Sequence, residues 1–157
     1  MEKIGFGFFS WDEIQMETNM MRSNLRRVAV AALLAASFGL ANAAEVPVVL
    51  TGDQEVPAVT TAAKGTGKIT IAADKSVSGT ITTTGITGTM AHIHEAAPGK
   101  NGAPIITLEK GADGSWSVPA GSKLTDTQYQ SFKAGNLYVN VHSDEHKGGE
   151  IRAQLKP

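Results

Sequence analysis

Short runs of alternating residues constrain the fold of this chain more than any other feature of its sequence. In residues 65–73, Ile69 and Ile71 alternate with threonine and lysine, and residues 77–84 repeat the pattern with serine and threonine between the apolar positions. A period of two places alternate side chains on opposite faces of a β-strand. Because only the turn-forming pair Asp74-Lys75 and one further residue separate the runs, they predict an antiparallel hairpin with one buried face.

The rest of the chain after residue 44 is also rich in short β-type runs. A capping box formed by Thr125 and Gln128 predicts one short helix, which runs to about Lys133 and ends before Gly135. Residues 54–59, interrupted by a proline, suit an edge strand or a loop. These elements favour an all-β fold, an antiparallel Greek-key β-sandwich with one helix in a connection. The other predicted strands are residues 45–50, 89–95, 104–109, 115–118, 137–142 and 150–155.

The segment before residue 44 has the pattern of an export signal. Residues 20–43 combine arginines near their start, an apolar run at residues 28–40 and the small-residue sequence Ala41-Asn42-Ala43, which predicts a signal peptide cleaved after Ala43. The apolar run is shorter than the roughly 20 residues of a membrane-spanning helix, so no membrane anchor is expected after cleavage. Residues 1–19 are acidic for a signal and are interpreted as an over-extended, unstructured start. The mature domain, residues 44–157, is predicted to be periplasmic or secreted.

Composition limits the partners and the chemistry of this domain. The formal net charge is −1 with no basic stripe, so nucleic-acid binding and binding to an anionic membrane are disfavoured. The chain contains no cysteine, so a metal site has to use imidazole, thioether, carboxylate or backbone groups. No nucleophile elbow, H-E-x-x-H motif or phosphate-binding glycine pattern is present. The sequence therefore leaves an enzymatic activity open but does not favour one.

Three histidines are expected to meet on one face of a sheet. His92 and His94 are two residues apart in a predicted strand, so their side chains share a face opposite Ile93. His142 ends a second predicted strand, in which the valines share one face and the polar residues share the other. If the two strands lie side by side, the three imidazoles converge in one pocket.

The last two predicted strands suggest a register that satisfies the alternation of both. In this register, Glu150 and Arg152 flank a histidine on the polar face, and they are expected to form a salt bridge more readily than to perform chemistry. The apolar residues of both strands then share the opposite face. The predicted cross-strand pairs are His142 with Glu150, Asn140 with Arg152, and Tyr138 with Gln154.

Three neutral imidazoles predict a site for copper, zinc or nickel. Copper is favoured over zinc, because it lies highest in the divalent affinity series and a cysteine-free exported site can hold it. Met90 lies on the same strand face as His92 and could bind Cu(I) through its thioether, although methionine more often fills a core. Further groups that could complete the site or orient its rings are Glu150, Asp144, Glu145, Glu95 and His146.

Four blocks of sequence together resemble a known family. They are residues 52–57, residues 91–94 followed by 101–104, residues 138–142, and residues 148–155. In this order they resemble the CHRD domain, a module named for chordin that also occurs in exported microbial proteins, and the resemblance covers nearly all of residues 46–155. It implies an extracytoplasmic β-sandwich of immunoglobulin-like or superoxide-dismutase-like type, and it implies no defined activity.

Three functions are consistent with these observations. The first is an exported domain that stores, delivers or buffers a metal ion through His92, His94 and His142. The second is an adhesion or protein-interaction module that holds no stoichiometric metal and binds a periplasmic or extracellular protein or a glycan. The third is a redox enzyme that uses copper at the same three histidines.

Overall fold

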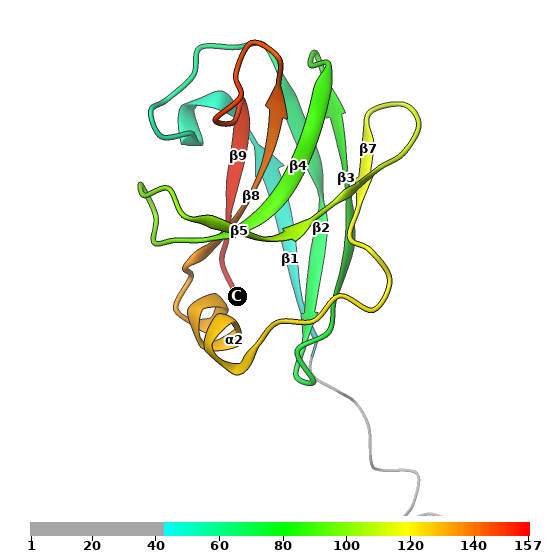
Figure 1. Ribbon diagram of the computed structural model, residues 1–157, viewed down its shortest axis with the longest axis vertical. Coiled ribbons are helices and arrows are strands. Elements are labelled where there is room, and N and C mark those ends of the chain that lie inside the picture. The colour runs from blue at the N-terminus through cyan, green and yellow to red at the C-terminus, as the bar shows by residue number, and fades with distance from the viewer. Residues whose placement is uncertain (1–42) are drawn as a thin grey trace, which may run out of the picture. The chain divides into compact units, whose positions relative to one another are not determined.

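The structure is a computed structural model that describes residues 43–157. The predicted over-extended start and the predicted signal peptide, up to residue 42, lie outside the described residues. The described chain forms two antiparallel sheets packed face to face, with one short α-helix at one end (Figure 1). The predicted all-β sandwich is confirmed.

The first sheet has five strands in the order β1-β2-β3-β7-β6. Its neighbouring strands run antiparallel, and β2 and β3 form the hairpin that the alternating runs predict. Most apolar residues of these strands point to the core, and serine, lysine and all threonines except the buried Thr83 point outward or lie partly exposed. The strands are β1 (Ala43–Leu50), β2 (Lys64–Ala72), β3 (Val77–Thr84), β6 (Glu109–Lys110) and β7 (Ser115–Ser117).

The second sheet has four strands in the order β5-β4-β8-β9, and it brings the two histidine-bearing strands together. In the pairing of β4 with β8, His92 lies opposite Asn140 and His94 lies opposite Tyr138. In the pairing of β8 with β9, Asn140 lies opposite Arg152, as the alternation predicts. The predicted pairing of Tyr138 with Gln154 is present too. The strands are β4 (Gly88–Glu95), β5 (Ala103–Thr107), β8 (Leu137–Ser143) and β9 (Ile151–Leu155).

The core between the sheets contains the inward-facing residues of both. Ala91 and Ile93 of β4 and the valines of β8 are fully buried there, which leaves the polar residues of these strands on the outer face. Trp116 of β7 fills the centre of one side with 2% of its surface exposed. The helix α2 (Asp126–Lys133) begins at the predicted capping box of Thr125 and adds Phe132 to the core.

Two parts of the fold differ from the simplest interpretation of the sequence. Residues 104–109 were expected to be one strand, but the chain leaves the second sheet after Thr107 and enters the first at Glu109. Leu108 lies between and buries its side chain, while its N–H donates to the carbonyl of Ala91 at 2.9 Å. Alternation is the same on either sheet, so it cannot reveal this crossing. The 3-10 helix η1 (Gly52–Gln54) begins the segment before β2. Residues 54–59, predicted to be an edge strand or a loop, form a loop there after Gln54.

Three connections cover the outer face of the second sheet or border it. Residues 51–63 and the turn between β8 and β9 lie at the end of the sandwich opposite α2 (Figure 1). The connection between β4 and β5 is tied to residues 51–63, because Asn101 Nδ2 donates to the carbonyl of Val56 at 2.6 Å. Side chains on this face are therefore largely buried, although they lie outside the core. Among the described residues, no helix has the length and apolar character that crossing a membrane requires.

Candidate metal centre

The three histidines predicted from the strand alternation form one cluster on the outer face of the second sheet. One ring nitrogen from each of His92, His94 and His142 lies within 4.8 Å of the others. The ring centroids are 5.0 Å apart for His92 and His142, 5.5 Å for His92 and His94, and 6.0 Å for His94 and His142. His94 and His142 are buried, and His92 is half-buried. The predicted convergence is present.

Backbone carbonyls fix the tautomers of two of the rings. His94 Nδ1 donates to the carbonyl of Gly102 at 2.9 Å, and His142 Nδ1 donates to the carbonyl of Lys147 at 2.9 Å. A carbonyl can only accept, so each Nδ1 carries the proton and each neutral ring has a free lone pair on Nε2. Proteins orient metal-binding histidines in the same way, with the second ring nitrogen held by a backbone carbonyl.

His92 is held differently from the other two rings. Its Nδ1 lies 3.0 Å from Nε2 of His142, and since the proton of neutral His142 is on Nδ1, His92 is the donor. Among the hydrogen bonds of the described residues, His92 has none to the backbone through its ring. It is therefore the ring that can turn most freely, and its bond to His142 is the one that a shared ion would replace.

Close backbone packing positions the carbonyl beneath His94. At Gly102 an added Cβ atom would collide with the carbonyl of Glu95, so only glycine lets this loop approach the end of β4. The Gly102 N–H also donates to the hydroxyl of Tyr138 at 3.3 Å. The Asn101-Gly102 turn predicted from the sequence thus holds both His94 and the ring next to it.

Burial lowers the pKa of all three histidines. For His92, the charges of His142 and His94 lower the pKa further, because one protonated ring repels the next. For His94 and His142, the bonds to Gly102 and Lys147 raise the pKa but only partly offset burial. The rings are therefore neutral at pH 7, which is the form that binds a metal ion.

The spacing of the nitrogens fits an ion after a small movement. Two nitrogens bound to one tetrahedral ion at about 2.05 Å lie roughly 3.4 Å apart. The 3.0 Å between His92 Nδ1 and His142 Nε2 is close to that value. Nitrogens of the cluster that lie farther apart, up to the limit of 4.8 Å, would have to move closer together. Rotation of the half-buried His92 ring is the simplest source of this change. Nε2 of His94 is buried with no hydrogen-bond partner among the described residues, so its lone pair is available to a metal ion.

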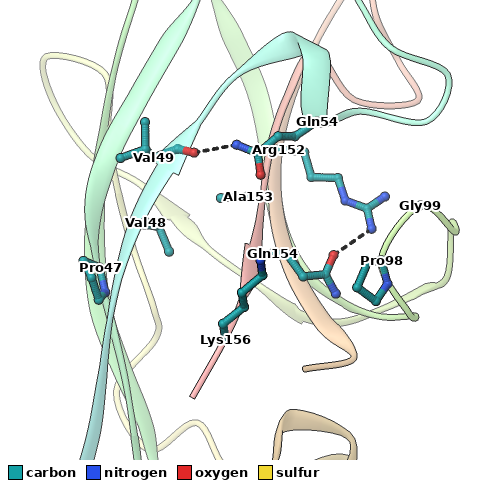
Figure 2. A pocket seen from close by; sticks show the side chains of 10 residues that line it. All are labelled: Pro47, Val48, Val49, Gln54, Pro98, Gly99, Arg152, Ala153, Gln154 and Lys156. Atoms are coloured by element: carbon teal, nitrogen blue, oxygen red, sulfur yellow. Dashed lines mark hydrogen bonds between the residues drawn. The ribbon is translucent and has the colours of Figure 1, made fainter. Parts of the chain in front are cut away.

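A column of stacked side chains connects the cluster to a groove. The His94 ring stacks on Tyr138 at 4.7 Å with 5° between the planes, and Arg152 Cζ lies 3.4 Å from the Tyr138 ring centroid. Arg152 also donates to Asn101 and Gln154. It forms part of the wall of a groove of about 450 Å³ between β1 and β9 (Figure 2). The other residues of this wall are Pro47, Val48, Val49, Gln54, Pro98, Gly99, Ala153, Gln154 and Lys156.

The predicted salt bridge between Glu150 and Arg152 is wrong. Neither residue belongs to an ion pair within 4.0 Å among those of the described chain. Glu150 instead accepts from the hydroxyl of Thr61 at 2.7 Å, at the start of β9. The guanidinium of Arg152 lies against the Tyr138 ring, so Glu150 and Arg152 have different partners although they are only two residues apart.

The carboxylates considered as additional ligands lie outside the three-histidine cluster. Asp144 and Glu145 are exposed in the turn after β8, and Glu95 accepts from Ser131 at 2.6 Å. His146, in the same turn, is half-buried and is not part of the cluster. Met90 is 50% exposed and lies directly opposite His142 in the β4 and β8 pairing.

Sequence reasoning missed Glu55 as a part of this region and gave Asn140 no role. Glu55 is 6% exposed and Asn140 is 1% exposed, and Glu55 Oε1 and Asn140 Nδ2 lie together against Gly149. Glu55 comes from a connection far from the histidines along the chain, so no strand pattern indicates it. The only available signal is its place in residues 52–57, one of the blocks that carry the family resemblance.

The fold and the cluster define a class of protein: an antiparallel β-sandwich domain with three histidines gathered on the outer face of one sheet. The chain belongs to the CHRD domain family, whose family model matches residues 46–155. The match includes all three histidines and most of the chain, so the resemblance found in the sequence blocks is confirmed. Comparison with curated proteins and with solved structures gave no match.

Proposed function

We propose that this domain binds one transition-metal ion through His92, His94 and His142 and stores, delivers or buffers that ion outside the cytoplasm. The observation that carries the proposal is the arrangement of the rings. One nitrogen of each lies within 4.8 Å of the others, and two rings are locked by backbone carbonyls so that their lone pairs lie on Nε2. The buried, unpartnered Nε2 of His94 supports it further.

Copper is the proposed ion, ahead of zinc. Imidazole nitrogens bind both, and Cu²⁺ binds such donors more tightly than the other divalent ions of the first transition row. The export signal predicted at residues 20–43 supports a periplasmic or secreted location. The chain has no cysteine, so its site would hold copper there through imidazole nitrogens instead of thiolates. Three protein ligands also leave one coordination position open for a water molecule or for a ligand of the acceptor.

Titration of the purified protein with Cu²⁺, followed by electron paramagnetic resonance, tests the proposal. We expect one bound ion per chain with nitrogen hyperfine structure, because imidazoles supply the ligands. The double substitution His92→Ala and His142→Ala should abolish this spectrum. His146→Ala is the matched control, since this fourth histidine lies outside the cluster and its removal should leave the spectrum unchanged.

A spectrum that the double substitution leaves intact would end the proposal. The other functions considered from the sequence give different results in the same preparation. An adhesion or protein-interaction module would hold no stoichiometric metal, and its thermal stability would be indifferent to a chelator. A copper redox enzyme would turn over superoxide faster than the same amount of free copper.

A further inference from the structure

Unpartnered buried atoms gather beside the histidine cluster. In the described chain, four buried side-chain nitrogen or oxygen atoms have no hydrogen-bond partner. One is Trp116 Nε1 in the core. The other three are Glu55 Oε1, Asn140 Oδ1 and His94 Nε2; Asn140 lies beside Glu55 at Gly149 and is the diagonal neighbour of His94 on the same face of the paired strands β4 and β8. Buried polar atoms without partners are rare, so three of them in contiguous side chains indicate a position where a further group binds.

The chemistry of the atoms indicates which group is missing. His94 Nδ1 carries the ring proton, because it donates to Gly102, so the neutral ring exposes a lone pair at Nε2. Asn140 Oδ1 is also an acceptor, and it can bond to Nε2 only when that nitrogen is protonated. Two acceptors that face each other in a buried site are favourable only with a positive group between them.

Glu55 determines the direction in which the Asn140 amide points. Asn140 Nδ2 and Glu55 Oε1 both lie against Gly149, so closely that a Cβ atom at this position would collide with them. With Nδ2 on the Gly149 side beside the Glu55 carboxyl, Oδ1 points the other way along the amide, on the sheet face that Asn140 shares with its cross-strand neighbour His92. Glu55 is 6% exposed and takes part in no ion pair within 4.0 Å among the described residues. Burial without an ion-paired partner disfavours the charged form of this carboxyl group unless a positive group lies nearby.

We propose that Asn140 Oδ1 supplies an oxygen to the same ion, directly or through one water molecule, and that Glu55 orients Asn140 and compensates the charge of the ion. This inference rests on the proposed function. Amide oxygen is a harder ligand than thioether, and a nearby carboxylate stabilises a doubly charged ion more than a singly charged one. The site therefore selects Cu²⁺ or Zn²⁺ over Cu⁺. Glu55 is a positioning residue, since it acts through Asn140.

Two other arrangements give different selectivity. Met90 lies opposite His142 on the exposed part of the same face, and a thioether ligand from it would favour Cu⁺. With the Asn140 amide reversed and Glu55 protonated, each of the three unpartnered atoms gains a partner without any ion. In neither arrangement does the charge of Glu55 favour a divalent ion.

The test compares Zn²⁺ and Cu⁺ affinities of the full chain, each measured by competition with a chromogenic chelator. Glu55→Gln keeps the shape and the acceptor of the side chain but removes its charge. We expect the Zn²⁺ affinity to fall by about 10-fold to 100-fold, as for other groups that orient metal ligands. Coulomb energy is proportional to ionic charge, so the Cu⁺ affinity should fall by only about 3-fold to 10-fold. The ratio of the two affinities then falls by about 3-fold to 10-fold.

Asn140→Ala should reduce Zn²⁺ affinity at least as much as Glu55→Gln, and circular dichroism confirms that the variant is folded. Met90→Leu is the matched control and should change neither affinity. A Glu55→Gln variant with an unchanged ratio of Zn²⁺ to Cu⁺ affinity overturns this inference, and so does a Met90→Leu variant that loses Cu⁺ alone. Both results leave the three-histidine site in place. A wild-type chain that binds neither ion removes the proposed function together with this inference.

Discussion

The two outer faces of this sandwich carry polar side chains under opposite conditions. On the first sheet, Thr66, Lys68 and Thr82 point into solvent, and the ion pair of Lys68 with Glu45 joins side chains that are 54% and 60% exposed. On the second sheet, Asn140 and Arg152 are 1% exposed beneath the connections that cover them. Both faces follow from the same alternation of residues, and only one of them is covered.

This difference determines what each face can do. Water satisfies an exposed hydroxyl or amine at little cost, so the first face can change without consequence for folding. Under the loops, each polar atom needs a partner within the protein, and an unpartnered atom costs on the order of 1–3 kcal/mol. The covered face retains unpartnered acceptors such as His94 Nε2 and Asn140 Oδ1, and the metal ion that we propose for this site would satisfy them.

The largest expected effect is that of removing the guanidinium at the centre of the covered face. Arg152→Ala should reduce the free energy of unfolding by roughly 3 kcal/mol, since it removes the hydrogen bonds to Asn101 and Gln154 and the packing on Tyr138. Lys68→Ala on the open face should cost less than about 0.5 kcal/mol. Urea denaturation measures both values. Equal effects at the two positions would erase the distinction between the faces.

Two neighbouring glycines provide the next comparison. Gly149 has φ +129°, and a Cβ atom there would collide with Glu55 and Asn140, whereas an added Cβ at Gly148 meets nothing within 4 Å. Gly149→Ala should therefore cost about 2 kcal/mol of stability and weaken metal binding, because it displaces the Asn140 amide. Gly148→Ala should change stability by less than about 0.5 kcal/mol. Thermal unfolding with and without Zn²⁺ measures both, and similar losses for the two variants would be inconsistent with the packing beneath Gly149.

Acidification should affect the covered face in a definite direction. The folded protein lowers the pKa of the three clustered histidines below the ordinary 6.5, so the unfolded chain binds more protons as the pH falls through that value. Stability of the metal-free protein is complete above about pH 6.5 and should decrease as the pH falls toward the lowered pKa values. Urea midpoints at intervals from pH 7.5 to pH 5.5 measure this. The decrease should be shallower in the variant with His92→Ala and His142→Ala, and an identical slope would show that these rings do not cause it.

The smallest effect is expected on the open face. Thr82 is exposed and pairs across β2 and β3 with Thr66, and neither hydroxyl is buried. Thr82→Val keeps the β-branched shape, so it should change the free energy of unfolding by less than about 0.5 kcal/mol and leave metal affinity unchanged. Differential scanning calorimetry and metal titration measure the two quantities. A loss above about 1 kcal/mol would mean that the first sheet depends on its outer hydroxyls.

The sequence predicted much of the second sheet because alternation alone determines the directions of its side chains. The valines of β8 face the core, so Asn140 and His142 point to the outer face of the sheet. On β4, Ala91 and Ile93 face the core in the same way, so His92 and His94 point to the outer face. The register of β8 with β9 followed, because a slip of one residue would place a charged Arg152 in the core.

The parts that the sequence did not predict depend on contacts between distant segments. Glu55 reaches Asn140 because residues 51–63 fold over the sheet, and no local pattern encodes that path. The sequence pattern does not indicate the crossing of the chain between sheets at Leu108 either, since a strand alternates in the same way in either sheet. The expected salt bridge of Glu150 with Arg152 failed because closeness in sequence does not determine where a long side chain finds its best contact.

X-ray absorption spectroscopy of the zinc-loaded protein tests the central claim most directly. We expect one ion per chain with three imidazole nitrogens at about 2.0–2.1 Å and the outer-shell scattering that imidazole rings produce. The variant with His92→Ala and His142→Ala should lose this signal, and the His146→Ala variant should retain it. A coordination shell with fewer than two imidazoles, or one that is the same in both variants, would contradict a metal centre built from these three histidines.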